Sequence, residues 1–170
     1  MTAFAALLRA VNVGGTGPLS MTDLKAMCEA AGFEQVKTYI ASGNVVFTSR
    51  LTEARVKAAL EKALHAHAGK PVGVMVRTAA EMAAVLKNNA FPDAPGNYSV
   101  AIFLDEAPPR DALKAVTGED GEAMALGTRE IYVSYPRGQG QSRLKIAAAK
   151  NGTARNMNTV AKLAEMSAAL

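Results

Sequence analysis

Polar side chains that can bind an anion are concentrated near the C-terminus of this chain of 170 residues. Five of them fall between positions 153 and 159: Thr153, Arg155, Asn156, Asn158 and Thr159. The pattern predicts a helix capped by Asn156, with Arg155 just ahead of its positive end. The guanidinium group offers a planar set of donors that suits phosphate or carboxylate. The alternative is that Asn156 only caps the helix and that Arg155 pairs with a carboxylate elsewhere in the chain.

The distribution of charge also indicates an anionic partner. Residues 136–162 carry six Lys or Arg side chains and no Asp or Glu. The rest of the chain holds 13 basic and 15 acidic groups, so the whole excess behind the net charge of +4 lies in this basic segment. Such asymmetry favours a phosphate-bearing partner: a nucleic acid, a nucleotide or a phosphorylated metabolite.

Two glycine-containing loops in the first half are further candidates for anion binding. The loop with Asn12, Gly14 and Gly15 lies between an expected strand and an expected helix, so its backbone amides could face an anion. It matches neither the dinucleotide fingerprint nor the P-loop, and a tight strand-to-helix turn is the favoured explanation. Ser42 and Asn44 flank a glycine in the second loop, which is what a hairpin turn needs whether or not anything binds there.

Residues suited to catalysis or metal binding are few. His65 and His67 stand two apart on an expected helix, so they project from different faces and do not form a close metal pair. Cys28, the single cysteine, lies on the apolar face of another expected helix, where thiols are commonly buried and inert. We therefore expect no metal and no cofactor.

The composition places the chain among globular proteins. Hydrophobic residues make up 49% and charged residues 20% of the sequence, as in ordinary folded domains. Apolar runs are too short to span a membrane, and the apolar start lacks the basic lead-in of a signal peptide. A single cysteine allows no intramolecular disulfide, which predicts a reducing, cytoplasmic location.

The elements expected in the first half follow the order βαββαβ. Strands are predicted at residues 4–11, 35–40, 44–48 and 72–76, with helices at 20–32 and 52–69. Ser20 and Thr52 are the expected helix caps. This order is the ferredoxin-like pattern, in which two helices cover one face of an open sheet.

The second half repeats roughly the order βαββα after a connecting helix and loop at residues 78–97. Thr78 and Glu81 form an expected capping box at the start of that helix. Strands are predicted at 98–104, 122–126 and 130–135, and helices at 110–116, 143–150 and 157–168. The predicted fold is therefore α+β, with an N-terminal ferredoxin-like subdomain (1–77) and a C-terminal α+β variant (78–170) that ends in two helices.

Four stretches together resemble one family. They are ALLRAVNVGG at 6–15, YIASGNVVF at 39–47, Tyr135-Pro136 with Gly138, Ser142 and Leu144, and TARNMNTV at 153–160. In this combination the chain resembles the bacterial domain-of-unknown-function family 1697 over nearly its whole length. The resemblance implies two ferredoxin-like subdomains and no established activity. The chain departs from the family pattern at Ala10, where Gly is usual, and at Met157, where Trp is usual.

Three kinds of function are compatible with these residues. The first is a binding module for a phosphate-bearing partner, held by the basic segment. The second is a small-molecule enzyme in which Arg9, Arg155 and Asn158 hold an anionic substrate. The third is a structural or interaction protein whose motifs serve only turns and caps. Binding to polynucleotide that falls steeply with salt would support the first function, and saturation of a discrete pocket by one metabolite would support the second.

Overall fold

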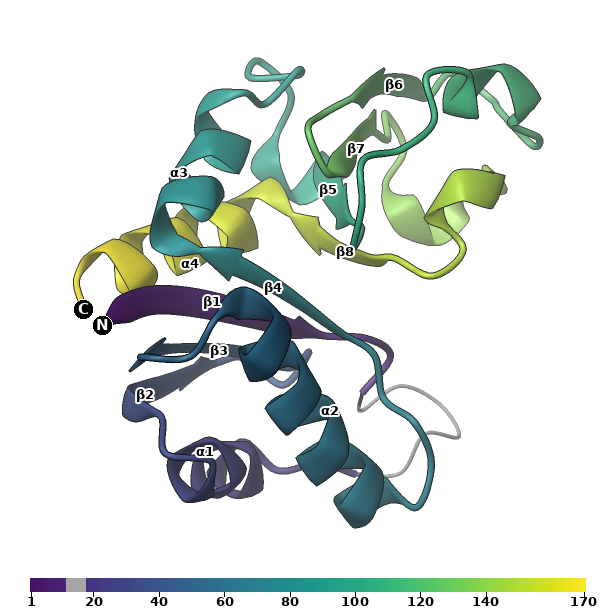
Figure 1. Cartoon of the computed structure of the whole chain (residues 1–170). Coiled ribbons are helices and arrows are strands. Elements are labelled where there is room, and N and C mark those ends of the chain that lie inside the picture. The colour runs from purple at the N-terminus through teal and green to yellow at the C-terminus, as the bar shows by residue number, and fades with distance from the viewer. Residues whose placement is uncertain (12–17) are drawn as a thin grey trace. The chain divides into compact units, whose positions relative to one another are not determined.

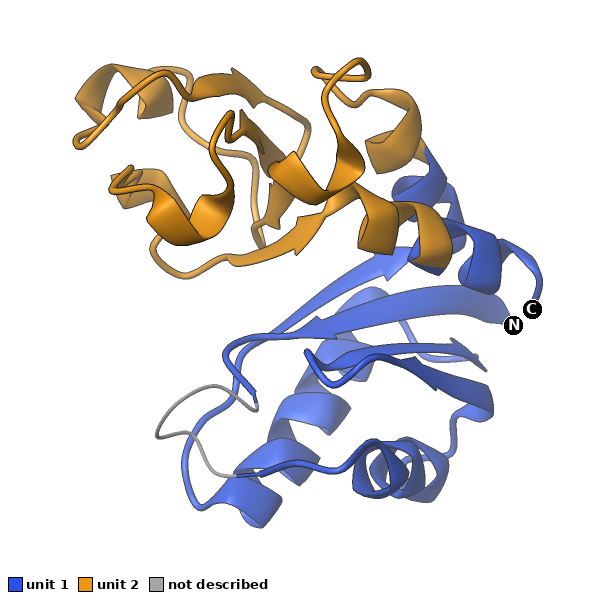
Figure 2. Cartoon of the chain, turned by 180° about the vertical axis from the view of Figure 1, so that it is seen from behind, with its two compact units in different colours: residues 1–83, 163–170 blue, residues 84–162 orange. Residues whose placement is uncertain are grey.

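The computed structural model describes residues 1–11 and 18–170 and divides into two compact units (Figures 1 and 2). Unit 1 comprises Met1–Ala83 and Leu163–Leu170, and unit 2 comprises Ala84–Lys162. Each unit contains a four-stranded antiparallel sheet. The fold is therefore α+β. Within the described ranges, no helix is both long enough and apolar enough to cross a membrane.

Unit 1 follows the order βαββαβ. Its elements are β1 (Thr2–Leu8), α1 (Met21–Ala30), β2 (Glu34–Tyr39), β3 (Asn44–Ser49), α2 (Glu53–Ala68) and β4 (Val74–Thr78). The strand order in the sheet is β2-β3-β1-β4. Both predicted caps are confirmed, because Ser20 Oγ accepts a hydrogen bond from the Asp23 amide and Thr52 Oγ1 accepts one from the Arg55 amide.

The main core of unit 1 lies between the sheet and its two helices, which share one side of the sheet (Figure 1). Phe4, Ala6 and Leu8 of β1 face this core. Ala5 and Leu7 point to the opposite face and are equally buried, so β1 is apolar throughout rather than alternating. Cys28 is fully buried on α1, as predicted, and burial raises the pKa of its thiol to about 12.

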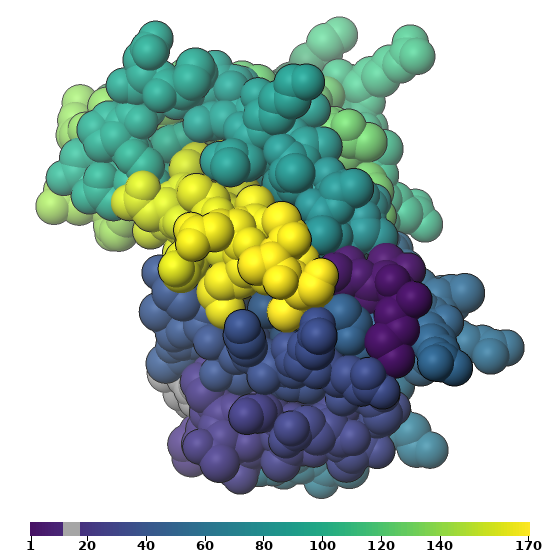
Figure 3. All heavy atoms as spheres, turned by 90° about the vertical axis from the view of Figure 1, so that its left-hand side faces the viewer, coloured from purple at the N-terminus to yellow at the C-terminus, as the bar shows by residue number. Residues whose placement is uncertain are grey.

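The two ends of the chain meet in unit 1. The last residues of α4 (Met157–Ala168) and the short tail beyond it belong to this unit. The first and last residues lie side by side at its surface, as the ribbon and the space-filling view both show (Figures 1 and 3).

Unit 2 has the same strand order as unit 1, but the connections between its strands contain short 3-10 helices instead of α-helices. Its strands are β5 (Ser99–Phe103), β6 (Ala123–Leu126), β7 (Glu130–Ser134) and β8 (Thr153–Asn156), arranged β6-β7-β5-β8. Matching β5–β8 to β1–β4 reproduces the order of the first sheet. The connections contain short 3-10 helices, namely η1 (Gly96–Tyr98), η2 (Ala112–Ala115), η3 (Gln139–Gln141) and η4 (Ala147–Ala149). The division between the units falls inside α3 (Ala79–Lys87) and α4.

The helix expected at residues 143–150 does not form. Lys145 instead exchanges two backbone hydrogen bonds with Thr117, at 2.8 and 3.1 Å, which holds it in an extended bridge. Ser142 Oγ accepts a hydrogen bond from the Leu144 amide and so closes a local turn instead of capping a helix. Only η4 remains helical, so the chain ends in one α-helix rather than the two that the sequence predicted.

Two other elements of unit 2 differ from the sequence prediction. The helix expected at 110–116 is the short 3-10 helix η2, and β8 was not expected at all. The four residues of β8 include Thr153 and Arg155, which are polar side chains buried on one face of the strand. Because the apolar alternation typical of a strand is missing there, the pattern predicted a loop before the last helix.

Candidate functional site

Ser42 and Asn44 are brought together in the turn between β2 and β3. The amide of Asn44, a buried residue, donates to Ser42 Oγ at 2.9 Å and to the Tyr39 carbonyl at 3.0 Å. Gly43 between them has φ +88°, and a Cβ there would lie 2.6 Å from Val11 Cγ2. The glycine therefore allows the turn to pack against the end of β1. These contacts support the hairpin interpretation of this stretch.

Arg9 is the other candidate of unit 1 within the described residues, since Asn12, Gly14 and Gly15 lie outside them. Its amide donates to the Gly73 carbonyl at 2.8 Å, and its side chain is exposed at the rim of a pocket. All described lining residues of this pocket belong to unit 1.

Arg155 is buried rather than displayed at a helix start. It is 8% exposed on β8, opposite Ala101 of β5. Its Nη1 atom donates to Thr153 Oγ1 at 2.7 Å and to the Ala154 carbonyl at 3.0 Å. Burial lowers the pKa of the guanidinium to about 10, so the group is still charged at neutral pH. Thr153 and Arg155 are thus joined to each other on the buried face of a strand.

The remaining candidates surround the first turn of α4. Asn156 caps this helix as predicted, because its Oδ1 accepts a hydrogen bond from the Thr159 amide at 2.9 Å. Thr159 itself is buried, whereas Asn158 is exposed. Asn158 also packs over Gly96, where an added Cβ would lie 2.1 Å from its Oδ1.

A pocket of about 400 Å³ lies in unit 2, between the segment that leads into β6 and the loop that follows β7. We call it the Tyr135 pocket. Its lining residues are Gly118, Asp120, Glu122, Tyr135, Pro136, Arg137, Gly138, Gln141, Ser142 and Arg143. The volume falls in the lower part of the range for small-molecule sites, roughly 300–1,000 Å³. Two of the basic-segment residues, Arg137 and Arg143, lie in this lining.

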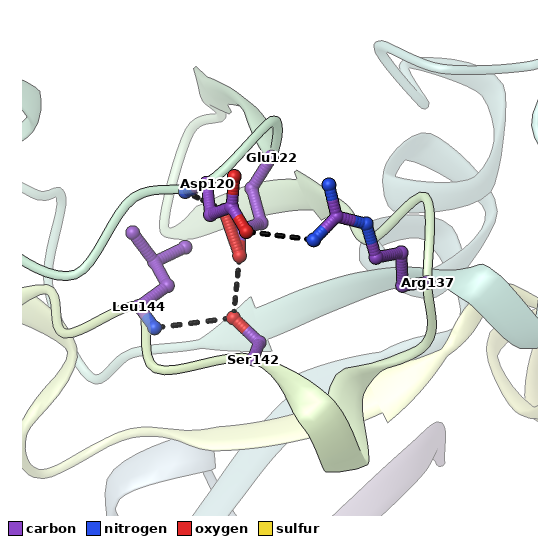
Figure 4. Close-up of polar contacts among 5 residues, drawn as sticks. All are labelled: Asp120, Glu122, Arg137, Ser142 and Leu144. Atoms are coloured by element: carbon purple, nitrogen blue, oxygen red, sulfur yellow. Dashed lines mark hydrogen bonds and ion pairs between the residues drawn. The ribbon is translucent and has the colours of Figure 1, made fainter.

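Glu122 fixes the loop that forms one wall of the Tyr135 pocket (Figure 4). One carboxylate oxygen accepts a hydrogen bond from the Ser142 hydroxyl at 2.7 Å, and the other accepts one from the Asp120 amide at 2.6 Å. The hydrogen bond from the Asp120 amide, followed by the one from the Ser142 hydroxyl, lowers the pKa of Glu122, and the charge of Arg137 adds to this effect. Glu122 is therefore ionised at neutral pH, with both of its oxygens occupied by the chain.

Gly118 completes the same wall. It has φ +73°, and a Cβ there would lie 2.0 Å from the Arg143 carbonyl oxygen. Only glycine allows the two segments to approach this closely.

The donors that the pocket offers to a ligand include Tyr135 and the two arginines, with the Gln141 amide beside them. Tyr135 is 6% exposed, and its hydroxyl has no hydrogen-bond partner among residues 1–11 and 18–170. Burial, followed by the nearby charge of Glu122, raises the pKa of this hydroxyl, which is therefore a neutral donor. Arg137 Nη1 pairs with Asp120 Oδ2 at 2.7 Å, and both side chains are largely exposed (Figure 4). Arg143 is also exposed and lines the pocket.

Sequence reasoning did not identify Tyr135, Glu122 or Ser142 as site residues. Tyr135-Pro136, Gly138 and Ser142 did carry the family resemblance, and that was the available signal. Glu122 had none, since acidic residues at a turn, such as Glu119, Asp120 and Glu122, look like a solvated face. Among the described residues, no group of three His, Cys, Asp or Glu side chains is placed to hold a metal ion.

The fold and the pocket define a small α+β protein of two antiparallel sheets with a ligand-sized cavity. The chain belongs to the family described as "Protein of unknown function (DUF1697)", which matches residues 1–132. A solved structure of a conserved bacterial protein from Streptococcus pneumoniae is similar to it, with 25% identity and a TM-score of 0.80 over 98% of each chain. The similarity to that protein therefore extends through the Tyr135 pocket. No curated protein matches the chain significantly.

Proposed function

We propose that this protein binds a phosphate-bearing small molecule in the Tyr135 pocket, where Arg137 and Arg143 of the basic segment hold the phosphate. The observation that carries the proposal is Tyr135, a nearly buried residue whose hydroxyl has no hydrogen-bond partner among the described residues, in a pocket with two arginines. Because Tyr135 lines the pocket and its hydroxyl makes no bond to the described part of the chain, this hydroxyl can donate to a ligand there.

The charges around the pocket favour a small ligand over a polynucleotide. Asp120 and Glu122 line the same cavity as Arg137 and Arg143. A single phosphate can bind Arg143 and the guanidinium nitrogens of Arg137 other than Nη1, which pairs with Asp120, whereas a continuous polyanion would also have to pass the two carboxylates that repel it. The basic segment also presents less free charge than its composition implied, because Arg155 is buried and Arg137 is paired with Asp120.

The finer description of the fold is part of the same proposal. The βαββαβ order and the strand order of unit 1 support a ferredoxin-like class for that unit. The repeated strand order supports a variant of the same class for unit 2, with 3-10 turns replacing its helices. A cytoplasmic, bacterial setting is supported by the single buried thiol and by the bacterial source of the similar structure.

The test is a thermal-shift screen followed by calorimetric titration with adenosine monophosphate, ribose 5-phosphate, inorganic phosphate and a ten-nucleotide RNA. A ligand supplied at about 100 times its Kd stabilises the folded state by about 2.7 kcal/mol, which is readily measured. We expect one of the small phosphates to bind at a single site.

Three variants assign the binding to the Tyr135 pocket. We expect Tyr135→Phe to weaken binding about three- to tenfold and Arg143→Gln to weaken it about tenfold or more, since each removes a donor while keeping the local shape. Arg110→Gln removes an exposed charge from the same unit but outside the pocket, and it should bind like the wild type. Equal losses in all three variants, or tight RNA binding that is insensitive to Tyr135→Phe, would contradict the proposal.

A further inference from the structure

A second pocket, of about 340 Å³, lies in unit 1 where β1 ends, α1 begins, α2 ends and β4 begins. We call it the Arg9 pocket. Its lining residues are Arg9, Ala10, Val11, Pro18, Leu19, Leu64, His67, Ala68, Lys70, Pro71, Val72 and Gly73. The pocket is independent of the Tyr135 pocket, since every lining residue belongs to unit 1.

Among the described residues, the ionisable side chains that line the Arg9 pocket are all basic. Arg9, His67 and Lys70 are exposed, and none of the described residues that line the pocket is acidic. The acidic residue on the adjoining face of α2, Glu61, is bridged to Lys57. The C-terminal end of α2 carries a partial negative charge of about half an elementary charge, which disfavours an anion. This partial charge is smaller than the two full positive charges of Arg9 and Lys70.

The rest of the pocket wall is apolar. Val11, Leu19 and Leu64 are buried residues of the unit 1 core, and Val72 packs against the same core. Pro18 and Pro71 add two further apolar surfaces. A hydrated inorganic anion gains nothing from such a wall, whereas a ligand with an apolar body buries surface against it.

The local backbone holds Arg9 in a defined position. Its amide donates to the Gly73 carbonyl at 2.8 Å, and a Cβ added at Gly73 would lie 3.6 Å from the Arg9 Cβ and Cδ atoms, in ordinary van der Waals contact. The next residue, Ala10, has φ +54°, a conformation that glycine adopts more easily. This explains why the family resemblance implies glycine at position 10. Strained residues of this kind are concentrated at functional sites.

We infer that the Arg9 pocket is a second binding site, which takes a small organic anion with an apolar body. Arg9 and Lys70 hold the anionic group at the rim, and Val11, Leu19, Leu64 and Val72 contact the apolar part. A carboxylate and a phosphate monoester share this chemistry, and the experiment distinguishes them.

The probe is 1-anilinonaphthalene-8-sulfonate, an aromatic anion whose fluorescence rises in an apolar site. We expect saturable binding at one site per chain. Arg9→Gln and Lys70→Gln should each raise the Kd about tenfold, as expected for the loss of one charged contact. Val72→Thr, which replaces one methyl group by a hydroxyl of similar size, should weaken binding several-fold because it places a polar group in the apolar wall.

Matched controls separate this site from general charge and from the Tyr135 pocket. Lys25→Gln removes an exposed positive charge from α1, outside the pocket, and should leave the Kd unchanged. Tyr135→Phe should also leave it unchanged, which makes this inference testable whether or not the proposed function holds. Circular dichroism of each variant confirms that it is folded.

Competition identifies the chemical group that the pocket prefers. Decanoate and decyl phosphate should displace the probe, and the tighter competitor shows whether carboxylate or phosphate is preferred, while uncharged decanol should compete poorly. The inference is wrong if the wild type does not bind the probe, if Arg9→Gln and Lys70→Gln bind as the wild type does, or if Lys25→Gln is weakened equally.

Discussion

Units 1 and 2 arrange their strands in the same order but cover their sheets differently. In unit 1 the two connections that follow β1 and β3 contain α1 and α2, and these helices supply much of the main core. In unit 2 the equivalent connections contain only short 3-10 helices, and the core is completed by side chains from those turns, such as Leu113 and Ile146. The same strand order is therefore compatible with a sheet packed against α-helices and with a sheet packed against short turns.

The last strands of the two sheets share a more specific feature. Arg77 on β4 and Arg155 on β8 are both buried, and each pairs in register with a fully buried alanine, Ala5 or Ala101. In both cases Nη1 donates to the carbonyl of the preceding residue, and the next residue, Thr78 or Asn156, caps the following helix. A small partner on the neighbouring strand leaves room for the long side chain.

The junction from the last strand to the capped helix has the same contacts in both units, while the connections between the strands differ. The loops of unit 2 that replace helices are also the ones that form the Tyr135 pocket. The connections without α-helices therefore line the proposed binding site, as is common for loops on a fixed scaffold.

The largest expected effect tests the difference between the α-helices that pack on the sheet of unit 1 and the 3-10 turns that pack on the sheet of unit 2. Leu60→Ala on α2 should lower the free energy of unfolding by about 2–5 kcal/mol, because the side chain is fully buried between a rigid helix and the sheet. Leu113→Ala on η2 should cost only about 1 kcal/mol, since this half-buried residue sits on a short turn that can close over the gap. Urea denaturation measures both, and a loss at Leu113 as large as that at Leu60 would contradict the difference.

A smaller effect tests the repeated junction. Arg77→Met and Arg155→Met keep most of the buried volume and remove the donors, so each should cost about 1–3 kcal/mol of unfolding free energy. We expect the two losses to be similar because the two guanidinium groups make the same bond to the preceding carbonyl. Arg50→Met, at an exposed position, is the control and should change stability by less than about 0.5 kcal/mol. A large loss at one junction and none at the other would break the equivalence.

The sequence predicted unit 1 well because its signals there are local. The caps at Ser20, Thr52 and Thr78 are marked by hydroxyl residues at the right spacing, and all three make the expected hydrogen bonds. The capping box of Thr78 with Glu81 is complete, since the Glu81 carboxylate also accepts a hydrogen bond from the Thr78 amide. Side chains that bond a backbone three residues away leave a pattern that a single sequence can reveal.

Unit 2 was predicted less well because its decisive contacts are distant in sequence. The bridge between Thr117 and Lys145 overrides the helical pattern of residues 143–150, and nothing near either residue signals it. The bond from Ser142 to Glu122 also spans 20 positions. Arg155 was expected at the surface because a charged residue near a helix start is usually exposed, whereas it lies on the buried face of β8, a strand that no local pattern indicated.

The smallest expected effect concerns pH and again compares the units. The ordinary pKa of Glu122 is 4.5, and it is lowered in the folded protein by the Asp120 amide and the Ser142 hydroxyl. As pH falls, the unfolded chain therefore binds a proton at Glu122 before the folded chain does. The stabilisation due to ionised Glu122 is complete above its ordinary pKa and is lost as pH falls through the lowered folded value.

Ser142→Ala should raise the folded pKa of Glu122 toward its ordinary value, because one of the two bonds to the carboxylate is removed. The variant should therefore be less stable than the wild type at neutral pH, and the difference should shrink as pH falls below about 4.5. Ser20→Ala in unit 1 is the matched control: its hydroxyl bonds only a backbone amide, so its loss should stay uniform over the same range. Unfolding free energies measured from pH 7 to pH 3, with a carbon-13 titration of the Glu122 carboxyl, provide the test. Parallel curves for Ser142→Ala and the wild type would mean that Glu122 does not depend on Ser142 for its charge.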